Sequence, residues 1–325
     1  MAAMVPRLRR CATIAAKAAP TKTAATTQVF IAPNRQYGAL RRSILLAAAL
    51  CLAALVSAAC AAPRGLGTAE RARLAALLPA DALLLGEQHD VPEHHRLERD
   101  TVQWLATRGV LAALLLEMAE QGHGTTGLPP NADEAAVRRA LAWDDAAWPW
   151  SDYGPVVMAA VRAGVPVLGA NLPRQQLREA MREPALDARL PAAALAEQRQ
   201  RIREGHCNAL PEAQIVPMTR VQIARDIAMA EAIERAAQPG RTVLLVAGGG
   251  HVDRRLGVPA HLAPNLKAKV LLVRADKAQS AINSIANDAA PEAGVDLLWT
   301  TAPGPPRDYC AEFQNLPRPP RARTQ

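Results

Sequence analysis

The sequence predicts an α/β protein with a largely parallel sheet, helices on both faces and a helical insertion at about 173–237 before the fourth strand. Short, continuous apolar runs alternate along the chain with longer amphipathic stretches, which is typical of parallel strands buried on both faces. Half of the residues are hydrophobic but only 3% are aromatic, so we expect an aliphatic core. The helical insertion separates two apolar runs, and we expect it to form a lid or cap.

The first half of the expected fold contains three strands and three helices. Pro92 suits the first turn of a helix, because its missing N–H has no partner there in any case. Ser151 or Asp152 is suited to capping the helix that ends at Arg162. Pro166 is tolerated near the start of a strand. Strands are expected at 81–86, 111–117 and 165–170, and helices at 92–108, 132–142 and 151–162.

The second half begins with the helical insertion and ends with three further strands. The final segment, 303–325, is rich in proline and arginine, and we expect it to be disordered. The folded α/β domain is therefore expected at 76–302. Within it, helices are predicted at 173–182, 192–204 and 214–237, and strands at 241–247, 269–273 and 295–300.

Residues 1–60 are expected to be a leader. Basic residues precede an apolar run at 44–56 that is short for a membrane span, and small residues then lead to Cys60, as in a secretory signal. This end resembles a lipoprotein processing site, although Ser57 stands where leucine is usual. We expect an exported protein with lipid on Cys60, held at the outer membrane and facing the periplasm. Cleavage to a free periplasmic protein is the alternative, and residues 61–75 would form a tether.

The positive net charge belongs to the leader. The chain has a formal net charge of +8, but residues 1–59 carry eight basic residues and no acidic one. The rest has 30 basic and 30 acidic residues, so its charge gives no reason to expect nucleic-acid binding.

The cysteines exclude a zinc ribbon, because none of the five forms a CxxC pair. Cys11 and Cys51 lie in the leader, and lipidation would consume Cys60. Cys207 and Cys310 remain, and they would be able to form one disulfide in an oxidising compartment. The sequence does not establish that these two residues meet.

Polar side chains follow four of the predicted strands. Ligands of open parallel sheets bind beyond the carboxyl ends of the strands, and neighbouring strands lie about 4.8 Å apart. Carboxylates and imidazoles from separate strands are therefore expected to meet at one rim. The residues concerned are Glu87, His89, Glu117, Asn171, Arg174 and His251.

Each of these residues also has an ordinary structural explanation. Glu87 and His251 are able to cap helices, His89 to sit in a turn, and Glu117 to pair with Arg174. The shared position at strand ends favours a site, because buried carboxylates and imidazoles are costly without a partner.

The rim residues suit two chemistries. Glu87, His89, Glu117 and His251 have the groups that acid–base catalysis needs, and Glu87, His89 and His251 have those that bind a divalent metal. Other sites are disfavoured because the chain has no GxGxxG, no GxxxxGK[ST], no GxSxG and no HExxH.

Several short motifs resemble the ChaN family of haem-binding lipoproteins. They span about residues 80–265, and their order and spacing together are fairly specific. The family belongs to a superfamily with Tiki-type metalloproteases and erythromycin esterases. The motifs are Gly86-Glu87-Gln88-His89-Asp90, Glu117-Met118, Asp152-Tyr153-Gly154-Pro155, Asn171-Leu172-Pro173-Arg174, the stretch from His206-Cys207 through Gln222, Arg225-Asp226 and Met229-Ala230, and Gly250-His251.

The resemblance implies haem binding for haem or iron uptake at the cell envelope, with homodimers that enclose stacked haems and an outer-membrane haem transporter as partner. It also implies a tyrosine ligand for the iron, which points to Tyr153, since tyrosinate suits ferric iron. Alternatively, Tyr153 packs beside Trp148 and Trp150. Other haem contacts would come from His89, Glu117, Asn171, Arg174 and His251, and His94, His95 and His206 are alternative ligands.

The same resemblance keeps a second function open. An envelope hydrolase, either an esterase or a metal-dependent enzyme, would use Glu87, His89, Glu117 and His251 to activate water. A scaffold with a degenerate pocket is a third interpretation. The sequence alone does not decide whether the protein is an enzyme.

Overall fold

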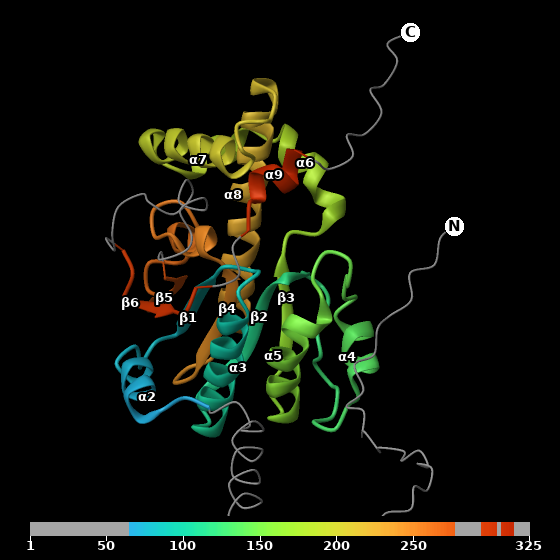
Figure 1. Cartoon of the computed structure of the whole chain (residues 1–325), viewed down its shortest axis with the longest axis vertical. Coiled ribbons are helices and arrows are strands. Elements are labelled where there is room, and N and C mark those ends of the chain that lie inside the picture. The colour runs from blue at the N-terminus through green and yellow to red at the C-terminus, as the bar shows by residue number, and fades with distance from the viewer. Residues whose placement is uncertain (1–64, 277–293, 304–306, 315–325) are drawn as a thin grey trace, which may run out of the picture. The chain divides into compact units, whose positions relative to one another are not determined.

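A computed structural model of the chain describes residues 65–276, 294–303 and 307–314. Six parallel strands form one sheet in the order β3-β2-β4-β1-β5-β6, which confirms the predicted α/β class (Figure 1). The strands are β1 (Ala82–Glu87), β2 (Leu111–Glu120), β3 (Val167–Asn171), β4 (Thr242–Gly248), β5 (Ala268–Ala275) and β6 (Leu297–Thr301).

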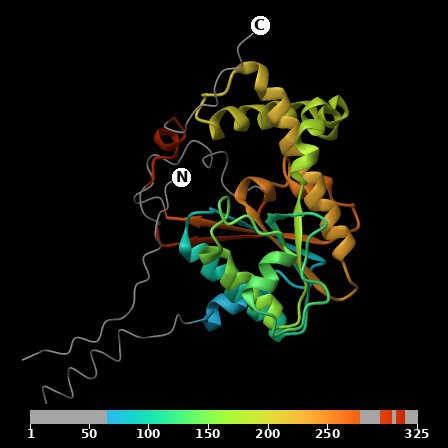
Figure 2. The ribbon, with the colours of Figure 1, turned by 90° about the vertical axis from the view of Figure 1, so that its right-hand side faces the viewer.

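Helices α3 (Pro92–Thr107) and α5 (Trp150–Arg162) cover one face of the sheet, and α8 (Glu212–Ala236) covers the other (Figures 1 and 2). Leu97 and Leu105 of α3 are buried in the first core, as their spacing predicts. Met229 and Ile233 of α8 are fully buried in the second. Helices therefore pack on both faces of the sheet.

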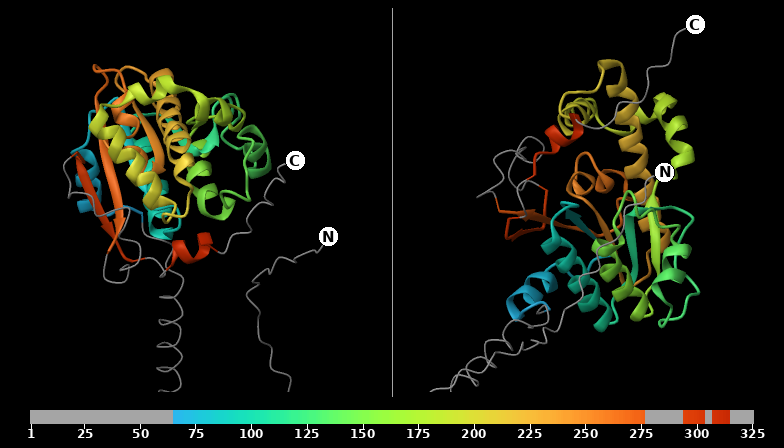
Figure 3. Two further views of the ribbon diagram at one scale, coloured as in Figure 1. Left: turned by 90° about the horizontal axis from the view of Figure 1, so that it is seen from above. Right: turned by 45° about the vertical axis from the view of Figure 1, so that its right-hand side comes forward.

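The helical insertion forms a cap beyond the carboxyl ends of the strands. In Figures 1 and 3, α6, α7 and the first part of α8 lie on that side of the sheet, while the last turns of α8 run along its face. This is the position expected for the predicted block at 173–237. The insertion consists of η1 (Arg174–Gln176), α6 (Leu177–Arg182), η2 (Pro184–Arg189), α7 (Ala192–Gly205) and α8.

One helix lies beyond each predicted limit of the domain. The expected tether, 61–75, includes helix α2 (Thr68–Ala75), whose Leu74 is fully buried in the first core. The expected disordered tail, 303–325, includes helix α9 (Tyr309–Gln314). Cys310 of this helix forms a disulfide with Cys207, which follows α7. Tertiary contacts hold these two helices, although neither segment has a long apolar run.

Two helices begin at other residues than the sequence predicts. Pro149, not Ser151 or Asp152, is the residue at the N-cap of α5. The predicted helix at 132–142 is shorter and forms α4 (Glu134–Ala140).

The leader and Cys60 lie outside the described residues. Within the described ranges, no helix is long and apolar enough to cross a membrane.

Candidate functional site

The four acidic and imidazole side chains predicted at the strand ends do meet at one rim of the sheet. His89 Nδ1 lies 2.9 Å from Glu87 Oε1, and His89 Nε2 lies 3.7 Å from Glu117 Oε2. His251 Nε2 lies 3.3 Å from Glu117 Oε1 on the opposite side of that carboxylate. His89 and Glu117 thus connect side chains from the ends of three strands, β1, β2 and β4.

The strand order explains how these side chains reach each other. Strand β4 lies between β1 and β2, so Gly248 at its end is paired with Glu87 and lies next to Glu117. Glu87 belongs to the row of β1 residues that faces α3 and α5, whereas Glu117 contacts Arg225 of α8. His89, from the loop after β1, spans the two sides across the end of β4.

Gly248 leaves the space that this arrangement needs. A Cβ atom at this position would lie 2.8 Å from His89 Nε2 and 3.5 Å from Glu117 Oε2. The backbone N–H of Gly248 also donates a hydrogen bond of 2.7 Å to Glu117 Oε2. Glycine is therefore required for the close approach of the imidazole to the sheet.

Glu117 and His251 are held by an ion-pair network from α8. His251 Nδ1 lies 2.5 Å from Asp226 Oδ1, and Arg225 Nη2 lies 2.5 Å from Glu117 Oε1. Burial alone would lower the pKa of His251, but Glu117 and Asp226 outweigh it and raise this pKa to about 9. Burial would raise the pKa of Glu117, but His251, His89 and Arg225 hold it well below its usual value. Both groups are therefore charged at neutral pH.

Glu87 belongs to a second buried network beneath the rim. Tyr153 donates its hydroxyl to Glu87 Oε1 at 2.8 Å, and His95 Nε2 lies 3.2 Å from Glu87 Oε2. Glu98 is fully buried nearby, and neither of its carboxylate oxygens has a hydrogen-bond partner. Burial and the charge of Glu87 raise the pKa of Glu98 well above its usual value.

The position of Tyr153 opposes its predicted role as an axial haem ligand. Its side chain is in the core, with 1% of the residue exposed, and its hydroxyl donates to Glu87. Burial and the Glu87 charge raise the pKa of Tyr153 far above that of a free tyrosine, which disfavours the tyrosinate. The ring packs near Trp143 and Trp148. The alternative interpretation of the sequence, in which Tyr153 packs beside tryptophans, named Trp148 and Trp150.

Asn171 and Arg174 do not join the rim in the way predicted. Asn171 Nδ2 donates to the backbone oxygen of Glu117, and its Oδ1 accepts from Arg225 Nε, so it positions that pair. Arg174 is largely exposed and pairs with Asp144 instead of Glu117. The arginine partner of Glu117 is Arg225, which the sequence placed in a family-like motif but did not pair with Glu117.

The alternative histidine ligands are also engaged elsewhere. His94 is fully buried, accepts from the backbone N–H of Gln88 and contacts the hydroxyl of Thr301. Burial lowers its pKa to about 4, so it is neutral. His206 Nδ1 bonds to the backbone oxygen of Ile202 at the end of α7.

The main pocket lies between this rim and the cap, and has a volume of about 750 Å³. His89, Glu117 and His251 lie in its wall with the backbone of 248–250, and Val252, Leu272 and Val273 add apolar surface. Five arginines also line it, and within the described part of the chain all of them except Arg274 form ion pairs with carboxylates. They are Arg201, Arg225, Arg254, Arg255 and Arg274.

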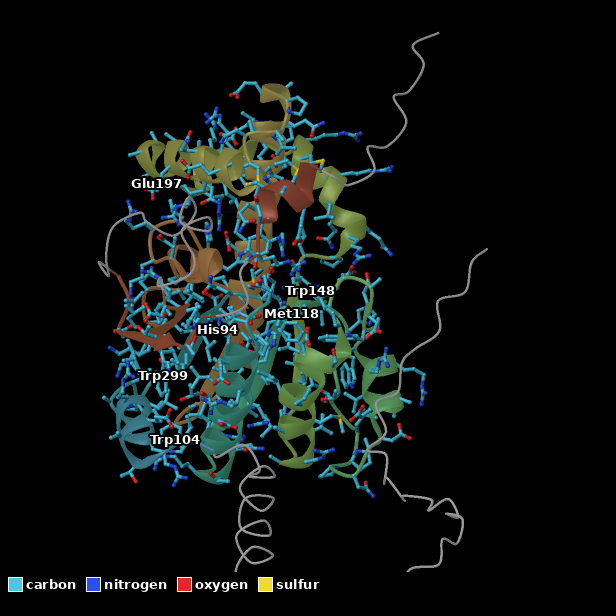
Figure 4. All side chains as sticks on the ribbon, viewed as in Figure 1. His94, Trp104, Met118, Trp148, Glu197 and Trp299 are labelled. Atoms are coloured by element: carbon cyan, nitrogen blue, oxygen red, sulfur yellow. A yellow bond between two sulfur atoms is a disulfide. The ribbon has the colours of Figure 1, made fainter. Side chains whose placement is uncertain are left out.

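A second pocket of about 410 Å³ lies on the other side of Arg225. Met118, Trp148 and Leu172 make part of it apolar, and His123 and Arg174 add polar groups. Figure 4 labels Met118 and Trp148 near the level of the strand ends, and Glu197 on α7 in the cap. Trp148 also packs edge-on against His89, with ring centroids 4.8 Å apart, and Glu117 and Arg225 line both cavities.

The predicted metal triad of Glu87, His89 and His251 does not form. In the part of the chain that the structure describes, the three residues whose ligand atoms converge are Glu87, His95 and Glu98. His251 instead contacts Asp226 and Glu117, which lie on the side of the sheet that α8 covers.

Comparisons with known proteins give the chain a family. The sequence model described as "Haem-binding uptake, Tiki superfamily, ChaN" matches residues 73–262, which is more than half of the chain. A solved structure described as cofacial heme binding to ChaN of Campylobacter jejuni is 23% identical, with a TM-score of 0.53. That alignment covers 63% of this chain and 85% of the other.

Two further structures align more weakly. The type III effector HopBA1 is 16% identical over 69% of this chain and 88% of its own, with a TM-score of 0.37. A protein from Bacillus cereus is 13% identical over 65% of this chain and 70% of its own, also with a TM-score of 0.37. No curated protein matches. The sequence match and the parallel fold agree, and the chain belongs to the ChaN family of the Tiki superfamily, described as haem-binding uptake proteins.

Proposed function

We propose that this protein binds haem in the main pocket, with His89 Nε2 as the axial ligand. The observation that carries the proposal is the geometry of this imidazole. Its side chain is 35% exposed, whereas those of Glu87, Glu117 and His251 are buried. Glu87 bonds to Nδ1, which leaves Nε2 directed away from Glu87, and such carboxylate-held histidines are typical metal ligands.

The rest of the pocket fits a haem. Its volume of about 750 Å³ lies in the range of small-molecule and cofactor sites. Val252, Leu272 and Val273 suit the apolar porphyrin face, and Arg255 and Arg274 suit propionate groups. When bound, the haem iron supplies a Lewis-acidic centre for a nitrogen ligand.

A protonated His89 would have to lose its Nε2 proton before this atom ligates iron. Burial would lower its pKa, but Glu117 and Glu87 outweigh this effect and raise it. Ligation therefore exchanges a proton for the metal, as at other histidine sites. Glu87 would retain its hydrogen bond to Nδ1 in both states, which keeps Nε2 beside Glu117 and Gly248 in the pocket wall.

The test is a hemin titration of the purified chain with His89→Ala. We expect the variant to lose the shifted Soret band of the wild type and to bind hemin at least about tenfold more weakly, because the iron loses its protein ligand. His123→Ala is the matched control, since His123 is exposed and lines the second pocket. An unchanged spectrum in His89→Ala, or loss of the band in His123→Ala, would place the haem elsewhere.

We further propose that the protein serves haem or iron uptake at the cell envelope as a lipoprotein anchored through Cys60. The order of charged, apolar and small residues before Cys60 supports this role. The relative from Campylobacter jejuni is described as binding heme cofacially. By analogy, two copies of this chain would face each other with a haem in each main pocket.

The hydrolase alternative is not favoured. A histidine that acts as a general base has to be neutral near the operating pH. Glu117 and Asp226 instead keep His251 protonated, since they raise its pKa to about 9 against the opposing effect of burial. The pKa of His89 is raised as well. His251 is therefore a poor proton acceptor at neutral pH, and the raised pKa of His89 also disfavours that role.

A further inference from the structure

We propose that Glu87, His95 and Glu98 form a buried site for one zinc ion, beneath the main pocket and separate from the haem. One ligand atom from each residue lies within 4.8 Å of the other two. All three residues are buried, and Glu98 has no exposed surface. The site uses two residues of helix α3 that the haem proposal does not involve.

The sequence places these ligands on one face of a helix opposite a strand end. His95 and Glu98 are three residues apart in α3, so their side chains lie on the same face of the helix. That face packs on the sheet, where Glu87 ends β1. The ring of Tyr153 lies 4.7 Å from the ring of His95, which limits the movement of this imidazole.

Four buried polar atoms in the cluster make no well-aligned hydrogen bond, although two of them, Glu87 Oε2 and His95 Nε2, lie 3.2 Å apart as an ion pair. They are Glu87 Oε2, His95 Nε2 and both carboxylate oxygens of Glu98. The hydrogen bonds from Tyr153 and His89 to Glu87 both go to Oε1 of its carboxylate. Buried polar atoms are nearly always satisfied in native proteins, so a group of four such atoms points to a missing partner. A bound cation would serve them together.

The charge of the cluster agrees with a divalent ion. Glu87 forms ion pairs with His89 and His95, whereas Glu98, which is fully buried, forms none with a basic side chain among the described residues, so its carboxylate is the group that lacks compensation. One imidazole and two carboxylates are a ligand set that zinc accepts. Ligands about 2.0–2.1 Å from a tetrahedral zinc lie roughly 3.3 Å apart. The 3.2 Å between His95 Nε2 and Glu87 Oε2 fits that spacing.

The proposed ion would support the haem pocket from below. It would bind Oε2 of Glu87, while Oε1 of the same carboxylate bonds to Nδ1 of His89. The carboxylate would then have both oxygens fixed, and His89 would be held in one orientation. Because the site is buried, the ion would enter as the chain folds.

The test counts zinc in the full chain, refolded in the presence of Zn²⁺ and without hemin, and then dialysed into metal-free buffer. Elemental analysis is expected to find about one zinc per wild-type chain and none in Glu98→Gln or His95→Gln, because each loses a ligand. Glu93→Gln is the matched control, since Glu93 lies on the same helix, is exposed and pairs with Arg96. Equal zinc in Glu98→Gln and in the wild type would overturn the proposal, as would its absence from the wild type.

Thermal unfolding with a chelator supplies the second readout. EDTA is expected to lower the Tm of the wild type and of Glu93→Gln, and to leave that of Glu98→Gln unchanged. A wild type that is insensitive to EDTA would mean that a proton, not a metal, compensates Glu98. Neither measurement uses hemin, so failure of the haem proposal leaves both results interpretable.

Discussion

At the scale of single residues, the site depends on contacts between groups that carry opposite charge. Glu117 accepts hydrogen bonds from Arg225 and from the backbone of Gly248, and it lies between His89 and His251. Each partner reduces the cost of burying the carboxylate. A change at any one of these positions therefore disturbs the position of His89, on which the proposed haem binding depends.

Gly248 offers a direct test of this packing. A methyl group there would lie 2.8 Å from His89 Nε2, so Gly248→Ala should displace the imidazole. We expect about 1–3 kcal/mol of destabilisation by urea unfolding, and weaker hemin binding in a titration. Gly250→Ala is the matched control, because no atom lies within 4 Å of a Cβ at that position. Equal effects of the two substitutions would argue against the close approach of His89.

At the scale of elements, the sequence predicted what each segment forms better than where it ends. Strands 111–117 and 241–247 appear as β2 and β4, because buried parallel strands are continuous apolar runs. Helix α9 was missed because its order comes from a disulfide instead of an apolar face. Gln222, Arg225 and Asp226 lie on one face of α8, and that helical spacing was the signal available for finding them.

The disulfide between Cys207 and Cys310 is expected to stabilise the cap and α9. It joins residues 103 positions apart, so it restricts the unfolded chain strongly. Cys310→Ser should lower the free energy of unfolding by about 2–4 kcal/mol, measured by urea unfolding under oxidising conditions.

The matched control is the double variant Cys207→Ser with Cys310→Ser, which should lose no more than the single variant. Stability that is the same in reducing and oxidising buffer would contradict a disulfide that forms in the native protein.

At the scale of the whole molecule, the main pocket requires parts from across the chain. Arg201 comes from α7, Gln222 from α8, and Arg274 from β5, while the strand ends supply the remaining wall. The cap therefore completes the site and does not merely cover the sheet. This assembly explains why a chain with balanced mature charge has five arginines around one cavity.

The proposed location of the whole protein is tested by fractionating cells that express the full chain. We expect the wild type in the membrane fraction with a lipid mass on Cys60, because acylation adds favourable membrane partitioning. Cys60→Ser should move to the soluble fraction, and Cys51→Ser, a cysteine within the apolar run, should not. Wild type found only in the soluble fraction would favour the free periplasmic form.

The sequence by itself determined the α/β class, the positions of the strands and the residues at their ends. These features follow from local hydrophobic patterns, which do not depend on how distant segments pack. Only the tertiary structure decided that β4 separates β1 from β2, that Arg225 and Asp226 reach Glu117 and His251, and that Tyr153 is buried under the rim. Strand order and burial result from packing between distant segments, and the local sequence pattern contains no signal for either.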